Sequence, residues 1–152
     1  MRKKKNKKVA ILGKLPTKFK APFGDDTWDI WTLNIHPDEN QLPRISLWFD
    51  IHSHGINPKA NITRANYPFK EAEELVGGQY YNNSISYMIA YAILHKYKEI
   101  ALYGMAFLND NEHRRSEFLN VRELIMFARG KGLKITAPED PVMLQEYEYY
   151  GL

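Results

Sequence analysis

Short apolar runs without polar alternation recur along the chain and predict strands that are buried on both faces of a sheet. These runs cover residues 9–12, 28–33, 45–51, 100–105 and 134–137. Gly13, Asn34 and His52 directly follow the first three runs, and residues of these types commonly end a strand. Residues 57–67 hold polar residues and a proline without a clear period, and they are predicted to form a loop. The pattern therefore predicts five strands.

A helical repeat of apolar residues lies between the third and fourth strands. Its members recur at intervals of three and four residues: Ile85, Met88, Ile89, Ala92 and Ile93. They predict a helix over residues 84–96, and the other positions of this stretch are also largely apolar, so we expect the helix to be heavily buried. Asn82, Asn83 and Ser84 are all favourable N-cap residues. Further helices are predicted over residues 69–76, around 121–128 and over 142–148.

Strands that alternate with helices indicate a parallel sheet covered on both sides. The sequence therefore predicts an α/β fold, a single Rossmann-like domain over residues 9–152. We expect a mostly parallel five-stranded sheet with helices on both faces and strand order 3-2-1-4-5.

Composition supports one folded domain and excludes several classes of protein. The chain has 152 residues, of which 44% are hydrophobic and 26% charged, values typical of a globular protein with one core. The absence of cysteine excludes disulfides, thiol nucleophiles and thiolate metal sites. No apolar run approaches the length of a membrane span, and no apolar segment of a secretory signal follows the basic start. We therefore expect a cytoplasmic protein with no membrane partner.

The net charge of +3 is misleading because it comes from one end of the chain. Residues 1–8 hold six of the 21 basic residues and none of the 18 acidic ones, so the remainder carries 15 basic and 18 acidic residues, a net charge of −3. Residues 1–8 are predicted to be a disordered basic tail. Nucleic acid is expected as a partner of this tail at most, because the body offers no excess of positive charge.

Ligands of a Rossmann-like sheet bind at the carboxyl ends of its strands, near the point where the strand order reverses. After the first strand, Gly13 allows a tight turn, and Lys14 and Thr17 can donate to a phosphate. This loop is neither GxGxxG nor a Walker loop, since the later glycines are missing. Asn83 and Ser84 open the best helix, where free N–H groups favour an anion, although capping alone also explains them.

Four of the five histidines also fall at this edge: His36, His52, His54 and His113. In an extended chain, His52 and His54 would point to one side together with Asp50, which makes a metal site conceivable. The spacing matches no known metal motif, so no metal and no cofactor are predicted.

Several segments, in this order, resemble a group of small phage-encoded Rossmann-like proteins of unassigned function. They are residues 8–13 (KVAILG), 16–17 (PT), 28–34 (WDIWTLN), 82–90 (NNSISYMIA), 99–105 (EIALYGM) and 128–133 (ARGKGL). More distantly, the same framework is similar to bacterial sialyltransferases that use a CMP-sugar donor.

The sialyltransferase resemblance implies roles for individual residues. It places Gly13, Pro16 and Thr17 on the nucleotide loop, Asn34 on the base- or ribose-binding asparagine, Asn83, Ser84 and Ser86 at the helix start, and Gly104 on the following strand. The position of the family's catalytic histidine corresponds to Arg115, with His113 two residues earlier. Leu15 replaces the family's second loop glycine, and the chain lacks the family's lid and membrane-associating C-terminal part. The resemblance therefore implies nucleotide binding more strongly than glycosyl transfer.

Three functions remain open from the sequence. The first is binding of a nucleotide or nucleotide-derived small molecule, in a phage factor that acts on host nucleotide signalling in the bacterial cytoplasm. The second is an enzyme, a nucleotide-sugar-dependent glycosyltransferase or a nucleotide hydrolase, in which His113 or Arg115 acts at the scissile bond. The third is a protein-interaction module that uses the basic tail and the aromatic C-terminus, and the many tyrosines also allow a homodimer. In the first two cases, an alanine at Asn34 should weaken ligand binding at little cost in stability.

Overall fold

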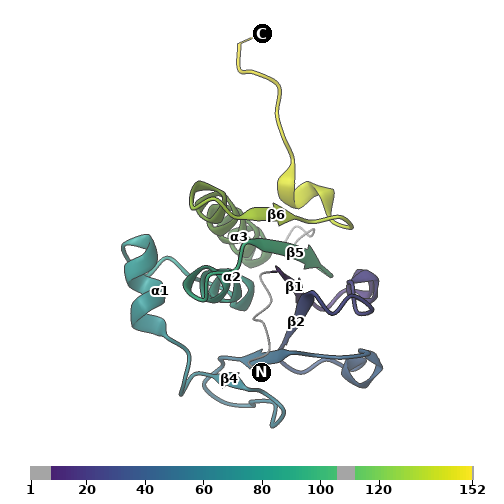
Figure 1. The fold of residues 1–152 in the computed structure, drawn as a ribbon. Helices are drawn as coiled ribbons and strands as arrows, with labels where there is room; N and C mark the ends of the chain where they lie inside the picture. Colours follow the sequence, from purple (N-terminus) through teal and green to yellow (C-terminus); the bar gives the residue numbers. More distant parts are fainter. Residues whose placement is uncertain (1–7, 106–111, 152) are drawn as a thin grey trace, which may run out of the picture.

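A single parallel sheet forms the centre of the computed structural model, which describes residues 8–105 and 112–151. The strands are β1 (Lys8–Leu12), β2 (Trp28–Leu33), β3 (Leu47–Asp50), β4 (Ile62–Thr63), β5 (Glu99–Tyr103) and β6 (Lys134–Thr136). Their order is β4-β3-β2-β1-β5-β6, and every neighbouring pair is parallel (Figure 1). The predicted α/β class and the order of the five predicted strands are confirmed.

The sixth strand, β4, lies inside the segment that was predicted to be a loop. It has only two residues, and they pair with Phe49 and Asp50 at the edge of the sheet. Two residues are too few to produce a periodic pattern, which explains why the sequence does not reveal this strand.

Helices cover the two faces of the sheet unequally. The α-helices α1 (Phe69–Val76), α2 (Ser84–Leu94) and α3 (Glu112–Gly130) all lie on one face (Figure 1). The opposite face is covered by the connecting loops with the 3₁₀-helices η1 (Pro16–Lys20) and η2 (Glu39–Gln41). The predicted cover on both faces is therefore present, but the second layer is thin.

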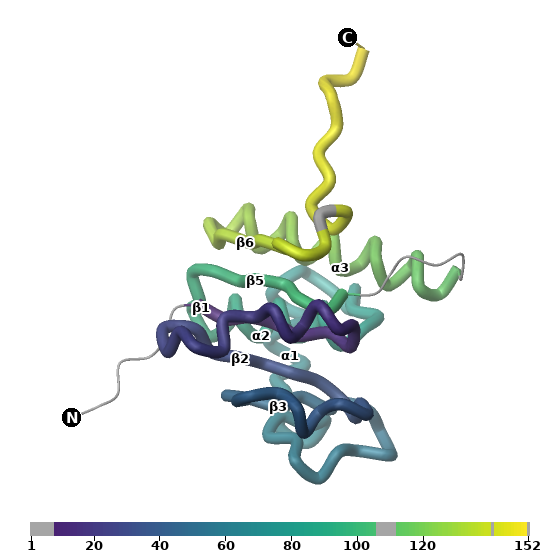
Figure 2. Tube along the Cα trace, turned by 90° about the vertical axis from the view of Figure 1, so that its right-hand side faces the viewer, coloured from purple at the N-terminus to yellow at the C-terminus, as the bar shows by residue number. Residues whose placement is uncertain are grey.

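Near the C-terminus, the predicted helix over 142–148 is wrong. The chain instead forms a 3₁₀-helix, η3 (Pro141–Leu144), and then leaves the body as an extended segment (Figure 2). Tyr147, Tyr149 and Tyr150 of this segment are exposed. None of the helices in the described residues has the length and apolar character needed to cross a bilayer.

Two cores follow from the alternation of side chains along the central strands. Val9 and Ile11 of β1 face the α-helices and belong to the large core, whereas Ala10 and Leu12 face η1 and η2 and belong to the small one. In the large core, α2 packs against the sheet with α1 and α3 on either side, which accounts for its lack of a polar face.

The carboxyl ends of β1 and β5 lie unusually close together, and two glycines permit this. A Cβ atom on Gly13 would meet the carbonyl oxygen of Gly104 at 2.2 Å. Gly104 has a positive φ of 70°, and its N–H donates to the hydroxyl of Thr17 at 3.1 Å. Because the chain turns from one side of β1 to the other between these strands, this contact marks the point where the strand order reverses.

Candidate functional site

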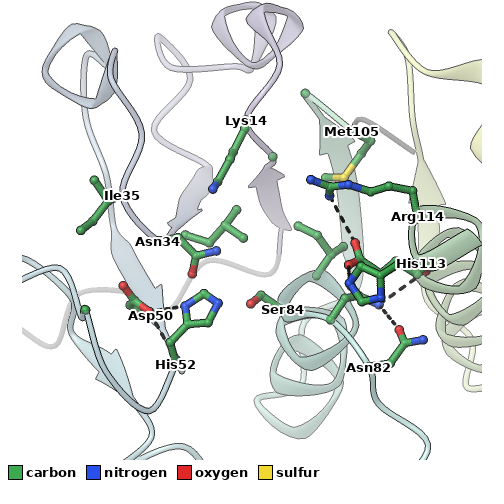
Figure 3. A pocket seen from close by; sticks show the side chains of 17 residues that line it. Lys14, Asn34, Ile35, Asp50, His52, Asn82, Ser84, Met105, His113 and Arg114 are labelled. Atoms are coloured by element: carbon green, nitrogen blue, oxygen red, sulfur yellow. Dashed lines mark hydrogen bonds and ion pairs between the residues drawn. The ribbon is translucent and has the colours of Figure 1, made fainter. Parts of the chain in front are cut away.

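A cavity of about 560 Å³ opens at the carboxyl edge of the sheet, beside the N-terminus of α2 (Figure 3). Seven of the predicted site residues line it: Gly13, Lys14, Asn34, Asn83, Ser84, Gly104 and His113. Thr17 and Arg115 do not line it. The hydroxyl of Thr17 instead accepts a hydrogen bond from Gly104, and Arg115 lines a separate hollow with Tyr80 and Ser116. The cavity lies at the place where the sheet rule locates ligands.

Asn34 ends β2 in a left-handed conformation, with a φ of 56°. Its carbonyl accepts hydrogen bonds from the indole Nε1 of Trp48 at 2.8 Å and from the Nδ2 of Asn57 at 3.2 Å. Its side chain points into the cavity, and its Oδ1 is shielded from solvent without a partner among the described residues (Figure 3). This φ bears on the expectation that alanine at Asn34 costs little stability, because alanine is strained in this conformation and should therefore destabilise the protein as well.

At the start of α2, Asn83 caps the helix, whereas the neighbouring Ser84 is available to a ligand. The Oδ1 of Asn83 accepts from the N–H of Ser86 at 3.0 Å, and its Nδ2 donates to Ser86 Oγ and Asn120 Oδ1. Asn83 is therefore the N-cap, and its polar atoms are used within the protein. The N–H groups of Ser84 and Ile85 have no intrahelical acceptor, as in any first turn, and both residues line the cavity.

The opposite wall carries a histidine that is oriented by a buried carboxylate. The side chain of Asp50 is 1% exposed, and its Oδ2 accepts from the N–H of Asn57 at 3.0 Å. Its Oδ1 lies 2.8 Å from Nδ1 of His52, whose ring is 57% exposed. This contact leaves Nε2 of His52 for the cavity that both residues line.

The sequence brings Asp50 and His52 together only as part of a conceivable metal site, whereas in the structure they pair with each other. The alternation of Asp50 and His52 was the signal that they share one side. His54 instead contacts Ser53 at 2.8 Å, and His36 lies buried beside Lys18 and Asp38. Within residues 8–105 and 112–151, no group of three ligating side chains is arranged to hold a metal ion.

The first turns of α3 supply the third wall. Nε2 of His113 lies 2.6 Å from Oε1 of Glu117, and Nη1 of Arg114 lies 3.3 Å from Oε2 of the same carboxylate. Residues 113 and 114 both lie beside residue 117 on the helix surface, because they precede it by four and three positions. Arg115 points about 100° away from Arg114 around the helix, so Arg114 is the arginine at the cavity.

Lys14 reaches into the cavity from the loop after β1 (Figure 3). A buried lysine, Lys18, holds this loop. The Nζ of Lys18, which is fully buried, donates to the carbonyl oxygen of Lys14 at 3.1 Å and forms an ion pair with Asp38. The hydrogen bond from Lys18, with a second from His36, lowers the pKa of Asp38 to about 2. The loop that presents Lys14 is thus held in place by Lys18.

Comparison with known proteins gives one informative result. No family model matches the chain, and no curated protein matches its sequence. Among solved structures, the sialyltransferase CST-II in complex with a trisaccharide acceptor and CMP superimposes with a TM-score of 0.50 at 17% sequence identity. The likeness is one of fold. It covers 85% of this chain and 79% of CST-II, so it extends over most of the fold rather than over one motif.

Proposed function

We propose that the cavity binds a nucleotide or a nucleotide-derived small molecule, with the anionic group at the start of α2. The observation that carries this proposal is the convergence of Lys14, Arg114 and the first turn of α2 on one cavity at the switch point of the sheet. The complex of CST-II with CMP, on a similar fold, supports the same class of ligand.

The walls of the cavity suit the different parts of a nucleotide. The N–H groups of Ser84 and Ile85, together with the ammonium of Lys14, provide donors for phosphate oxygens. The side-chain amide of Asn34, which lines the cavity, offers hydrogen bonds to a ribose hydroxyl or to a base edge. A volume of about 560 Å³ lies in the range of sites that enclose small organic ligands.

Thermal denaturation and calorimetry with CMP, UMP, AMP and GMP test this proposal. A nucleotide at 100 times its dissociation constant should add about 2.7 kcal/mol of apparent stability. The matching nucleosides serve as controls, and they should stabilise the protein less because they lack the phosphate. Lys14→Met should weaken binding, whereas Lys70→Met, at an exposed position of α1, should not. No stabilisation by any nucleotide would contradict the proposal.

An enzyme is the second candidate, either a nucleotide-sugar-dependent glycosyltransferase or a nucleotide hydrolase. The observation in its favour is that two histidines, each paired with a carboxylate, line the same cavity. The biological setting that we propose for either activity is the cytoplasm of a bacterium infected by a phage, where the protein acts on the host's nucleotide signalling. Product analysis after incubation with any nucleotide that binds separates a binder from an enzyme.

A further inference from the structure

We propose that His52 and His113 form a general base and general acid pair that hydrolyses a phosphodiester of a nucleotide. This inference rests on the proposed nucleotide site and names its substrate class and reaction. The two histidines come from elements that are distant in the sequence, the loop after β3 and the start of α3, and both line the one cavity. Figure 3 shows them on opposite sides of Ser84.

His52 has the surroundings of a general base. Its Nδ1 is held 2.8 Å from the carboxylate of Asp50, which fixes the ring and directs Nε2 away from Asp50. Asp50 itself is held by two backbone N–H groups, those of Asn57 at 3.0 Å and of His52 at 3.3 Å. A fixed carboxylate behind an exposed imidazole stabilises the charge that the ring gains when it takes up a proton. Asp50 is thus a positioning residue.

His113 has the surroundings of a general acid. Its Nε2 lies 2.6 Å from Oε1 of Glu117, a carboxylate that is only 13% exposed, and this contact holds the ring in place. Arg114 contacts the same carboxylate from the next position of the helix, so the ring and the guanidinium are both held at the wall of the cavity. Ser84, at the start of α2 where we propose that the phosphate binds, lies between the two histidines in Figure 3.

The reaction that follows is an in-line displacement at phosphorus. A water molecule gives one proton to Nε2 of His52 while its oxygen forms a new bond to phosphorus. The bond between phosphorus and the leaving oxygen breaks, and the imidazolium of His113 gives that oxygen a proton. The products are a phosphomonoester and an alcohol, and exchange with solvent returns both rings to their starting states. Lys14 and the N–H groups of Ser84 and Ile85 stabilise the non-bridging oxygens.

Two substrates of the full-length protein separate the roles of the histidines. The p-nitrophenyl ester of thymidine monophosphate releases p-nitrophenolate, which leaves as an anion and needs little help from an acid. Dithymidine monophosphate releases a sugar alkoxide, which needs a proton. We expect His52→Ala to lower kcat for both substrates by about 10²–10⁴-fold. His113→Ala should lower kcat for the dinucleotide far more than for the nitrophenyl ester.

The matched control is His54→Ala, because His54 is exposed, contacts Ser53 and does not line the cavity. Its rates should equal those of the unmodified protein. Asp50→Asn should lower kcat and alter the pH dependence of kcat, which a purely structural role of Asp50 would not do. Added imidazole should partly restore cleavage by His52→Ala. All assays contain EDTA, which removes metal-dependent contaminating phosphodiesterases.

Binding measurements on the same samples keep this inference separate from the proposed function. If nucleoside monophosphates bind and neither substrate is cleaved, the catalytic pair is wrong and nucleotide binding stands. Equal losses of activity in His52→Ala and His54→Ala would also overturn the assignment of His52. If no nucleotide binds, the proposed function itself fails.

Discussion

Asn34 shows how one residue can serve the fold with its backbone and a ligand with its side chain. Its carbonyl anchors Trp48 and Asn57, its left-handed φ ends β2, and its amide faces the cavity. Asparagine adopts this backbone region more readily than most residues, which suits it to both tasks.

Substitutions at Asn34 should separate the two tasks. Asn34→Gly should weaken nucleotide binding by about 1–3 kcal/mol, because a polar group of the ligand loses its partner. It should preserve most of the stability because glycine accepts a positive φ, whereas Asn34→Ala should also be destabilised by about 1 kcal/mol or more. Calorimetry and thermal denaturation provide the two numbers for each variant. Lys96→Gly is the control, since Lys96 also has a positive φ, of 64°, but lies outside the cavity.

Alanine substitutions of the neighbours Asn83 and Ser84 should affect different properties, stability for Asn83 and nucleotide binding for Ser84. Asn83→Ala removes the N-cap of α2 and should lower the free energy of unfolding by about 1 kcal/mol. Ser84→Ala should leave stability nearly unchanged and weaken nucleotide binding. The pair is measured by urea denaturation and calorimetry, and a loss of stability in Ser84→Ala equal to that in Asn83→Ala would contradict the assignment of the cap.

The sequence locates the candidate site better than it identifies the residues that act there. The rule for parallel sheets brings Lys14, Asn34 and Ser84 together because each directly follows a strand or opens a helix. It does not distinguish Arg114 from Arg115, since the rotation of α3 depends on where this helix starts and how it packs. The pairing of His52 with Asp50 depends on the path of the chain after β3, which alternation indicates only in part.

At the scale of elements, the contact between β1 and β5 depends on the absence of side chains. Gly13→Ala would place a methyl group 2.2 Å from the carbonyl oxygen of Gly104, a backbone atom that cannot move aside cheaply. We expect a loss of about 1–3 kcal/mol or more in the free energy of unfolding. Gly24→Ala is the control, because a Cβ at Gly24 meets no atom within 4 Å. Equal stabilities of the two variants in urea denaturation would show that the strand ends can separate.

The ion pair between Lys18 and Asp38 couples η1 to the loop before η2, and it should make stability depend on pH. Because the pKa of Asp38 falls from 3.8 to about 2 on folding, its ionised form stabilises the protein above pH 4, and this contribution is lost as the pH falls toward 2. Asp38→Asn should therefore be less stable than the unmodified protein at pH 7, and the difference should shrink toward pH 2. Thermal denaturation across this range measures it. A difference that does not vary with pH would contradict the role of the charge.

The long elements were predictable and the short ones were not. The repeat of Ile85, Met88 and Ile89 predicts α2 because burial on all sides leaves a strong pattern. The helix predicted around 121–128 begins at Glu112 in the structure. The sequence does not reveal these first turns, because they are polar and carry no apolar repeat. The helices η1 and η2 and the strand β4 depend on tertiary contacts rather than on local preference.

For the whole molecule, the distribution of charge matters more than its sum. Since the six basic residues between positions 2 and 8 account for the positive net charge, the remainder of the chain carries −3, and its net charge does not attract polyanions. Deleting residues 1–7 should lower the pI and leave the melting temperature nearly unchanged, because these residues contain almost nothing to bury. Scanning calorimetry of the truncated protein measures this, and a large drop would show that the segment packs on the body.

The indole of Trp48 provides an intrinsic fluorescence signal for ligand binding in the cavity. Trp48 stacks on the ring of His36 at 6.0 Å and donates to the carbonyl of Asn34, one residue of the cavity wall. Any ligand that shifts Asn34 alters the polarity and hydrogen bonding around this fluorophore. Trp31 lies in the large core, and Trp28 packs against the small core at the start of β2, the end of the sheet opposite the cavity. A change in tryptophan emission on titration therefore reports on the cavity through a single residue, without a label or a known reaction.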